Sequence, residues 1–153
     1  MRTYIWAWNR RPLTRSCSSV GGMPDHTVVN FLEVENQAPK FGMPEGFAAR
    51  FGREDLGLET LGVSHFKLDE GKGAPFGHRH PGGPEADEVY VVVSGEVQIK
   101  IGEDITDLKQ WDAVRVPGDQ WRALRGGSGG ATVLAFGARS AQSELDQEFW
   151  TGQ

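Results

Sequence analysis

Two histidines separated by one residue, His78 and His80, are the residues of this sequence best suited to chemistry. On a β-strand, residues two apart project from the same face, so both imidazoles point one way and Arg79 points the other. Glu88 follows at the head of the apolar run 89–93. Two neutral imidazoles and one carboxylate suit Fe(II), Mn(II), Zn(II) or Ni(II) and leave coordination positions open. The pattern therefore predicts one divalent metal ion bound by His78, His80 and Glu88.

Each member of this set also has an ordinary structural interpretation. The histidines can lie half-exposed beside a loop, and Glu88 can be a surface residue at the end of a strand. Strand parity places Glu88 and Tyr90 on one face. Tyr90 is therefore a candidate to contact a substrate or donate a proton, and its alternative role is packing with a hydrogen-bonded hydroxyl.

Composition limits the class of protein. The 153 residues fit one domain with a real core, and 21 glycines favour short strands and tight turns. The net charge is −5, and because residues 1–22 hold four arginines and no acid, the rest of the chain is at −9. An acidic body lacks the basic patch of a nucleic-acid-binding protein, so no nucleic-acid partner is predicted. No stretch has the length of a membrane span, and the single cysteine, Cys17, cannot form an internal disulfide, which favours the cytoplasm.

Short apolar segments recur along the chain at close intervals. Strands are predicted over 28–32, 61–68, 76–80, 88–93, 97–101, 105–108, 113–116, 120–124 and 131–136, helices over 45–51 and 141–149, and a glycine loop over 126–130. Such strands predict an all-β sandwich or small barrel. The expected organisation is a disordered extension (1–22), an arm with a short helix (23–59), the barrel (60–138) and a tail (139–153), with Phe149 and Trp150 docking on the body.

The metal motif resembles that of the cupin superfamily, which has the pattern His-x-His, a gap, Glu, six residues and Gly. Six residues separate Glu88 from Gly95, as the pattern requires. Glu85 fits the usual gap from His80 but does not have the required spacing to Gly95, and it is held in reserve as a ligand. The resemblance covers about residues 60–138 and is strongest to small single-domain bacterial cupins. It implies a double-sheet (RmlC-like) jelly-roll barrel, here with short helical segments at both ends, and a central pocket that often holds one metal.

A second cupin motif, Gly-x5-Pro-x-Gly-x2-His, is present in degraded form around Pro117. Its closing histidine falls on Arg122, and arginine has no lone pair with which to bind a metal. Two outcomes stay open. His78, His80 and Glu88 can hold the ion alone, with Arg122 orienting an anionic group. Alternatively Arg122 pairs with Glu88 and the pocket holds no metal.

Cupins range from isomerases and dioxygenases to sensors, so the fold leaves the reaction open. The resemblance favours a metal-dependent enzyme, dioxygenase- or isomerase-like, acting on a small anionic organic molecule, with Arg122 and Tyr90 as substrate-binding residues. The alternatives are a non-catalytic small-molecule binding or sensing protein that uses Arg122 as an anion anchor without metal, and a barrel whose pocket has lost its function. The arm at 28–42 and exposed barrel edges favour a strand-exchanging homodimer.

Overall fold

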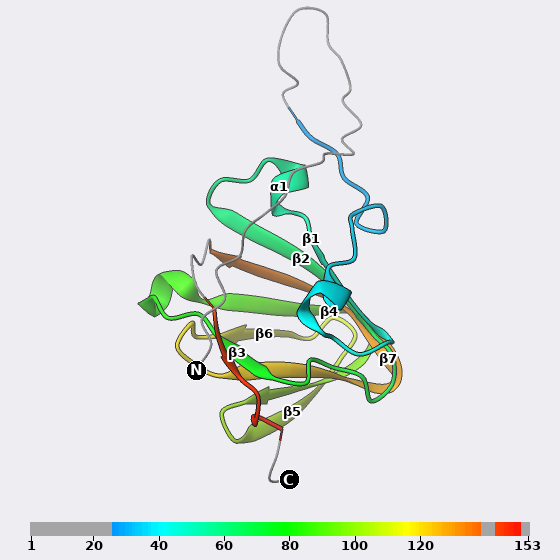
Figure 1. Ribbon diagram of the computed structural model, residues 1–153, viewed down its shortest axis with the longest axis vertical. Helices are drawn as coiled ribbons and strands as arrows, with labels where there is room; N and C mark the ends of the chain where they lie inside the picture. The colour runs from blue at the N-terminus through cyan, green and yellow to red at the C-terminus, as the bar shows by residue number, and fades with distance from the viewer. Residues whose placement is uncertain (1–25, 139–142, 151–153) are drawn as a thin grey trace, which may run out of the picture.

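The computed structural model describes residues 26–138 and 143–150, which form eight strands (Figure 1). The strands are β1 (Phe47–Phe51), β2 (Leu61–Leu68), β3 (Gly77–Arg79), β4 (Glu88–Ile101), β5 (Asp104–Lys109), β6 (Ala113–Val116), β7 (Arg122–Ala138) and β8 (Glu144–Asp146). The helical segments are η1 (Ala38–Phe41), α1 (Arg53–Leu56) and η2 (Gly83–Ala86). In the described part of the chain no helix is long and apolar enough to cross a membrane.

Hydrogen bonds join all eight strands into one continuous sheet that curls into two facing halves, called sheets below. The two long strands, β4 and β7, pair antiparallel along most of their length and belong to both halves (Figure 1). Their pairing around Tyr90 and Ala135 continues into a sheet of order β1-β2-β7-β4-β6. Their pairing around Ile99 and Leu124 continues into a sheet of order β8-β3-β7-β4-β5. Register shifts between Val92 and Ser94 and between Gly95 and Val97 bend β4 from the first sheet into the second.

Alternating side chains of β4 fill the space between the sheets. Tyr90 and Val92 of its first half are 2% and 0% exposed, and Val97 and Ile99 of its second half are 1% and 0% exposed. Leu68, Val116 and Val133 from the neighbouring strands complete this core. The strand pattern predicted an all-β sandwich or small barrel, and the arrangement is the double-sheet jelly roll that the cupin resemblance implied.

Both long strands correct the sequence prediction, which divided each of them in two. The turn expected at residues 94–95 is a pair of bulges within β4. The glycine run 126–130 lies inside β7 rather than in a loop. A Cβ on Gly126 would lie 2.2 Å from the carbonyl oxygen of Asp69, so a bare backbone is needed for this close approach.

The segment before β2 also differs from expectation. The helix predicted over 45–51 is wrong: Phe47 and Ala49 are buried on one face of β1, and pairing with β2 satisfies the backbone of this strand. The only α-helix in the described residues is the short α1, which ends at Gly57 in the left-handed conformation. No strand forms over 28–32, where a turn is closed by the Asn30 side chain accepting a hydrogen bond from the amide of Leu32 (3.0 Å).

In place of the helix predicted over 141–149, the described residues 143–150 form the short strand β8 (Glu144–Asp146) followed by a turn. β8 pairs with β3, the strand that carries His78. Phe149 docks on the body as expected and is 7% exposed, against Gly77. The disordered extension predicted for 1–22, which includes Cys17, lies outside the described residues.

Candidate metal centre

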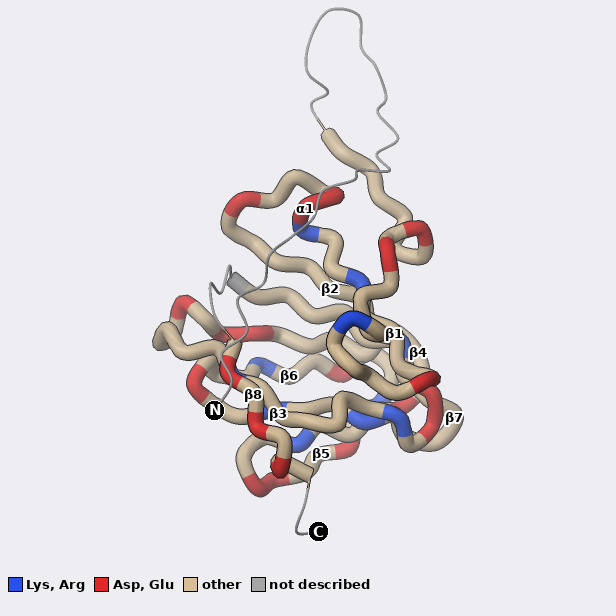
Figure 2. Tube along the Cα trace, in the orientation of Figure 1, with Lys and Arg blue, Asp and Glu red and all other residues tan. Residues whose placement is uncertain are grey.

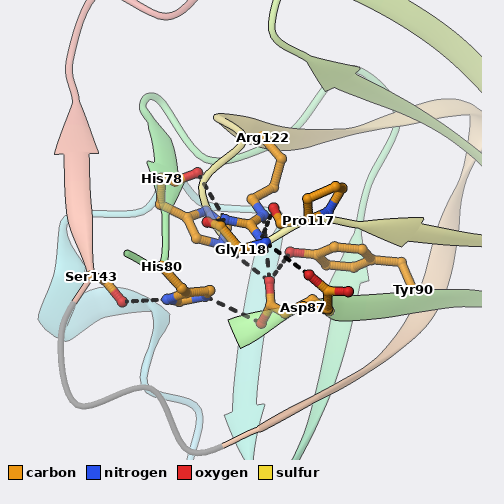
Figure 3. A network of polar contacts seen from close by, with 9 residues as sticks. His78, His80, Asp87, Tyr90, Pro117, Gly118, Arg122 and Ser143 are labelled. Atoms are coloured by element: carbon orange, nitrogen blue, oxygen red, sulfur yellow. Dashed lines mark hydrogen bonds and ion pairs between the residues drawn. The ribbon is translucent and has the colours of Figure 1, made fainter. Parts of the chain in front are cut away.

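The two histidines lie on and just beyond β3, a strand of three residues between β7 and β8. The amide of His80 donates to the carbonyl of Gly118 (2.7 Å), which keeps the chain extended one residue past the strand. Both rings therefore project from the same face, as parity predicted, with centroids 5.1 Å apart (Figure 3).

Glu88 begins β4 and brings its carboxylate between the two rings. Its Oε1 lies 3.3 Å from Nε2 of His80, and its Oε2 lies 3.7 Å from Nε2 of His78. Across the strand pair, Glu88 faces Gly137, and a Cβ on that glycine would lie 2.9 Å from Cγ of Glu88. Gly137 thus leaves room for the carboxylate, a role that sequence reasoning missed.

One ligand atom from each of His78, His80 and Glu88 lies within 4.8 Å of the others. Ligand atoms about 2.1 Å from a zinc-sized ion are about 3 to 3.5 Å from one another. The Nε2 atoms of His80 and His78 lie at similar distances from the carboxylate, 3.3 Å from Oε1 and 3.7 Å from Oε2. The donor set of two nitrogens and one oxygen is also one that first-row divalent metals accept. The residues therefore fit such an ion, and the structure brings together the three predicted ligands.

Tyr90, two residues after Glu88 on β4, contacts the Glu88 carboxylate. Its hydroxyl donates a 2.6 Å hydrogen bond to Oε2 of Glu88, and the residue is 2% exposed. Tyr90 was predicted as a substrate contact, and in this structure its hydroxyl is engaged with the carboxylate. The contact restricts the rotation of the Glu88 side chain.

Arg122 begins β7 directly opposite His78 and is fully buried. Its Nη1 donates to the carbonyl of Gly118 (3.2 Å) and lies 3.5 Å from that of His78, while Nη2 donates to the carbonyl of Pro117 (3.2 Å) (Figure 3). Its Nε is buried, has no hydrogen-bond partner, and lies 3.6 Å from Oε2 of Glu88. The guanidinium is thus tied to the backbone by its Nη atoms and turns Nε toward the carboxylate.

The electrostatics of the cluster favour an ionised carboxylate and an unprotonated imidazole. Burial opposes ionisation of Glu88, but hydrogen bonding and charge from His78 and His80 outweigh it and hold the pKa of Glu88 well below its usual range. Burial lowers the pKa of His78, and the neighbouring Glu88 only partly offsets this. Burial, together with the Glu88 charge, raises the pKa of Tyr90 well above its usual range. Anionic carboxylate and neutral imidazole are the forms that bind metals.

Ser143 is a further residue at the centre that sequence reasoning missed. It lies just before β8, and its Oγ is 3.0 Å from Nδ1 of His80. No sequence signal marks it, because its position depends on how β8 pairs with β3.

Other candidates lie elsewhere. Glu85, the reserve ligand, is exposed in η2 and outside the cluster. His65 is 9% exposed and stacked against Phe31. Trp111 is 71% exposed in this chain. His26 is exposed.

No family model and no curated protein matches the sequence. Solved structures do resemble this fold. A cupin protein from Bacteroides fragilis is 21% identical, with a TM-score of 0.61 over 77% of this chain and 87% of that one. A sugar phosphate isomerase of the cupin superfamily from Silicibacter pomeroyi is 23% identical, with a TM-score of 0.54 over 62% of this chain and 60% of that one.

Oxalate decarboxylase from Bacillus subtilis is 17% identical, with a TM-score of 0.61 over 76% of this chain. This chain spans only 31% of that larger protein. Identities at this level establish the architecture and leave the activity open. The chain has the cupin fold.

Proposed function

We propose that this protein binds one divalent metal ion through His78, His80 and Glu88 and acts as a metal-dependent enzyme, dioxygenase- or isomerase-like, on a small anionic organic molecule. The observation that carries the proposal is the convergence of the three ligand atoms within 4.8 Å of one another. A bound ion would act as a Lewis acid or as a template for substrate.

The preference for an anion rests on Arg122. A guanidinium 3.6 Å from Glu88 places a fixed positive charge close to the proposed ion, and two such charges repel each other. One carboxylate does not balance an ion of charge two and a guanidinium. An anion bound at an open coordination position would restore neutrality and accept a hydrogen bond from Nε of Arg122, which makes an ion pair with Glu88 but no hydrogen bond.

Arg122 would contact such an anion through a single nitrogen. Nη1 already contacts the carbonyls of His78 and Gly118 and Nη2 donates to that of Pro117, so Nε, which makes no hydrogen bond, is the nitrogen available to an anion beside Glu88. Tyr90 would hold the metal-binding carboxylate in place through its 2.6 Å hydrogen bond. Two structural neighbours, a sugar phosphate isomerase and oxalate decarboxylase, are named for anionic substrates, which agrees with this substrate class.

The test is metal analysis of protein purified without a histidine tag. Wild type, His78→Ala and His80→Ala would each be incubated with Fe(II), Mn(II), Ni(II) or Zn(II), freed of unbound metal and assayed for bound metal. About one ion per wild-type chain and a large loss in both variants are expected. Wild type that retains no more metal than the variants would overturn the proposal.

A second candidate is a non-catalytic binding or sensing protein that works without metal. It is favoured by the contact between Arg122 and Glu88, because this ion pair balances the carboxylate charge in the absence of an ion. A thermal-shift screen of carboxylates on metal-free protein tests it. Stabilisation that Arg122→Leu removes would support this candidate, and no shift with any anion would count against it.

The predicted absence of a nucleic-acid partner and the cytoplasmic location remain predictions. Figure 2 shows Lys and Arg interspersed with Asp and Glu along the described chain. This distribution supports a small-molecule ligand over a phosphate backbone, which would favour a continuous basic surface.

A further inference from the structure

We propose that Ser143 is a positioning residue of the metal centre, which holds the His80 ring with Nε2 turned toward the ion. The inference rests on the proposed metal site. It starts from the 3.0 Å contact between Oγ of Ser143 and Nδ1 of His80, shown in Figure 3. Ser143 is buried, at 9% exposure, and reaches His80 from a segment 63 residues away in sequence.

The register of β8 against β3 explains why these two residues meet. Gly77 pairs with Asp146, His78 with Leu145 and Arg79 with Glu144, so one further antiparallel step brings His80 opposite Ser143. Residues directly opposite in antiparallel strands project from the same face, with Cβ atoms about 5 Å apart. Ser143 therefore lies on the face of β3 from which both histidines project.

Contacts on either side of the site hold β8 in this register against β3. On the opposite face, Arg79 and Glu144 form an ion pair of 2.6 Å. Beyond β8, the carbonyl of Phe149 accepts a 2.6 Å hydrogen bond from Nζ of the buried Lys100. A slip of one residue would break both contacts and turn Ser143 to the other face.

The contact between Ser143 and His80 affects which nitrogen of the His80 imidazole carries the proton. A neutral ring carries one proton, and only the nitrogen without it can bind a metal. Nε2 of His80 is the nitrogen that faces Glu88, at 3.3 Å, so metal binding requires the proton on Nδ1. Nδ1–H then donates to Oγ of Ser143. Without this acceptor, the ring favours the tautomer in which Nε2–H donates to Glu88, which competes with the ion.

The experiment compares full-length wild type with Ser143→Ala and with the isosteric pair Ser143→Thr and Ser143→Val. Threonine and valine have almost the same shape and differ by the hydroxyl, so this pair decides the question even if alanine impairs folding. Ser128→Ala, at an exposed position, is the matched control. The probe is Co(II), whose affinity is measured by competition with a chelator and whose ligand geometry is reported by its visible absorption bands.

Loss of the hydroxyl in Ser143→Ala and Ser143→Val is expected to weaken Co(II) binding by about tenfold or more and to alter the absorption bands. Ser143→Thr should bind within a few fold of wild type with unchanged bands. If wild type binds Co(II) and the valine and threonine variants bind equally well with the same bands, the role of Ser143 is overturned and the metal site stands. If neither wild type nor Ser143→Thr binds Co(II), the metal site and this inference both fail.

Discussion

Nε of Arg122 lies 3.6 Å from Oε2 of Glu88, so a fully buried cation stands beside the carboxylate that completes the metal-ligand set. In the second cupin motif, the position of Arg122 is occupied by a histidine that serves as a fourth metal ligand. Here it supplies charge instead of a lone pair, and the guanidinium is held in place by the carbonyls of Pro117 and Gly118.

Replacing this cation by a ligand should strengthen metal binding. We predict that Arg122→His binds Zn(II) or Co(II) at least about tenfold more tightly, because a repelling charge is removed and an imidazole is added. The carbonyls that lose their donor should lower the free energy of unfolding by about 1–3 kcal/mol. Competition titration and urea unfolding measure the two effects. Metal affinity equal to or below that of wild type would show that charge at this position does not limit binding.

His65 should make stability depend on pH. Burial, reinforced by the charge of Arg50, lowers the pKa of His65 in the folded state, while the unfolded chain titrates near 6.5. Its contribution to stability is therefore complete above about pH 6.5 and is lost as the pH falls through the lower folded-state pKa. Urea unfolding from pH 5 to 8 should show a shallower dependence in His65→Gln than in wild type. Exposed His26→Gln is the control, and equal slopes in wild type and His65→Gln would contradict the prediction.

Two adjacent glycines of β7 should differ sharply in their tolerance of a side chain. Gly129 and Gly130 both have positive φ, 72° and 76°, but a Cβ meets nothing within 4 Å at Gly129 and would lie 2.4 Å from the carbonyl oxygen of Leu68 at Gly130. Gly129→Ala should cost about 1 kcal/mol of unfolding free energy and Gly130→Ala about 3 kcal/mol or more. Chemical denaturation measures both values. Similar losses of unfolding free energy in the two variants would show that the positive φ angle, and not the close contact with Leu68, causes the destabilisation.

The outer face of the first sheet carries apolar side chains suited to a second copy of this chain. Val63, Phe136 and Val89 lie in one row across β2, β7 and β4, with Val89 36% exposed. Residues 89–93 are apolar on both faces, which is typical of strands covered on both sides. The strand-exchanging homodimer predicted from the arm at 28–42 and the barrel edges stays a prediction, and this apolar face is a second surface at which dimerisation can be tested.

Sedimentation velocity should give wild type twice the 16.8 kDa chain mass, and Val89→Asp should shift it toward monomer. Ile105→Asp introduces the same charge at a similarly exposed residue (40%) on β5, in the other sheet, and should stay dimeric. Monomeric wild type would contradict the prediction, as would dissociation of both variants.

Parts of this architecture followed from local pattern. Strand parity predicted that His78 and His80 share a face, and the resemblance to the first cupin motif, through the spacing from Glu88 to Gly95, identified the carboxylate that joins them. The strand at Leu61–Leu68 was also predicted correctly. These features depend on the two-residue period of a β-strand, which can be recognised from a few consecutive residues.

The residues at which each strand begins and ends were harder to predict. Bulges carry β4 through Gly95, and β7 passes through five residues that read as a flexible loop, because glycines are needed where Asp69 approaches the backbone. Local composition does not distinguish a glycine in a flexible loop from a glycine in a strand that lets a neighbouring backbone carbonyl approach closely. The helix predicted at 45–51 failed in the same way, since pairing with β2 overrode local preference.

By itself the sequence predicted an all-β sandwich or small barrel, which the cupin resemblance narrowed to a jelly roll, and it predicted the three residues able to bind a metal ion. Alternation and spacing are properties of neighbouring residues, so these features can be recognised without the tertiary structure. Tertiary structure alone decided that Arg122 turns Nε toward Glu88 and that Ser143 meets His80. These contacts join segments far apart in the chain, so they exist only once the pairing of β3 with β7 and β8 has set the register.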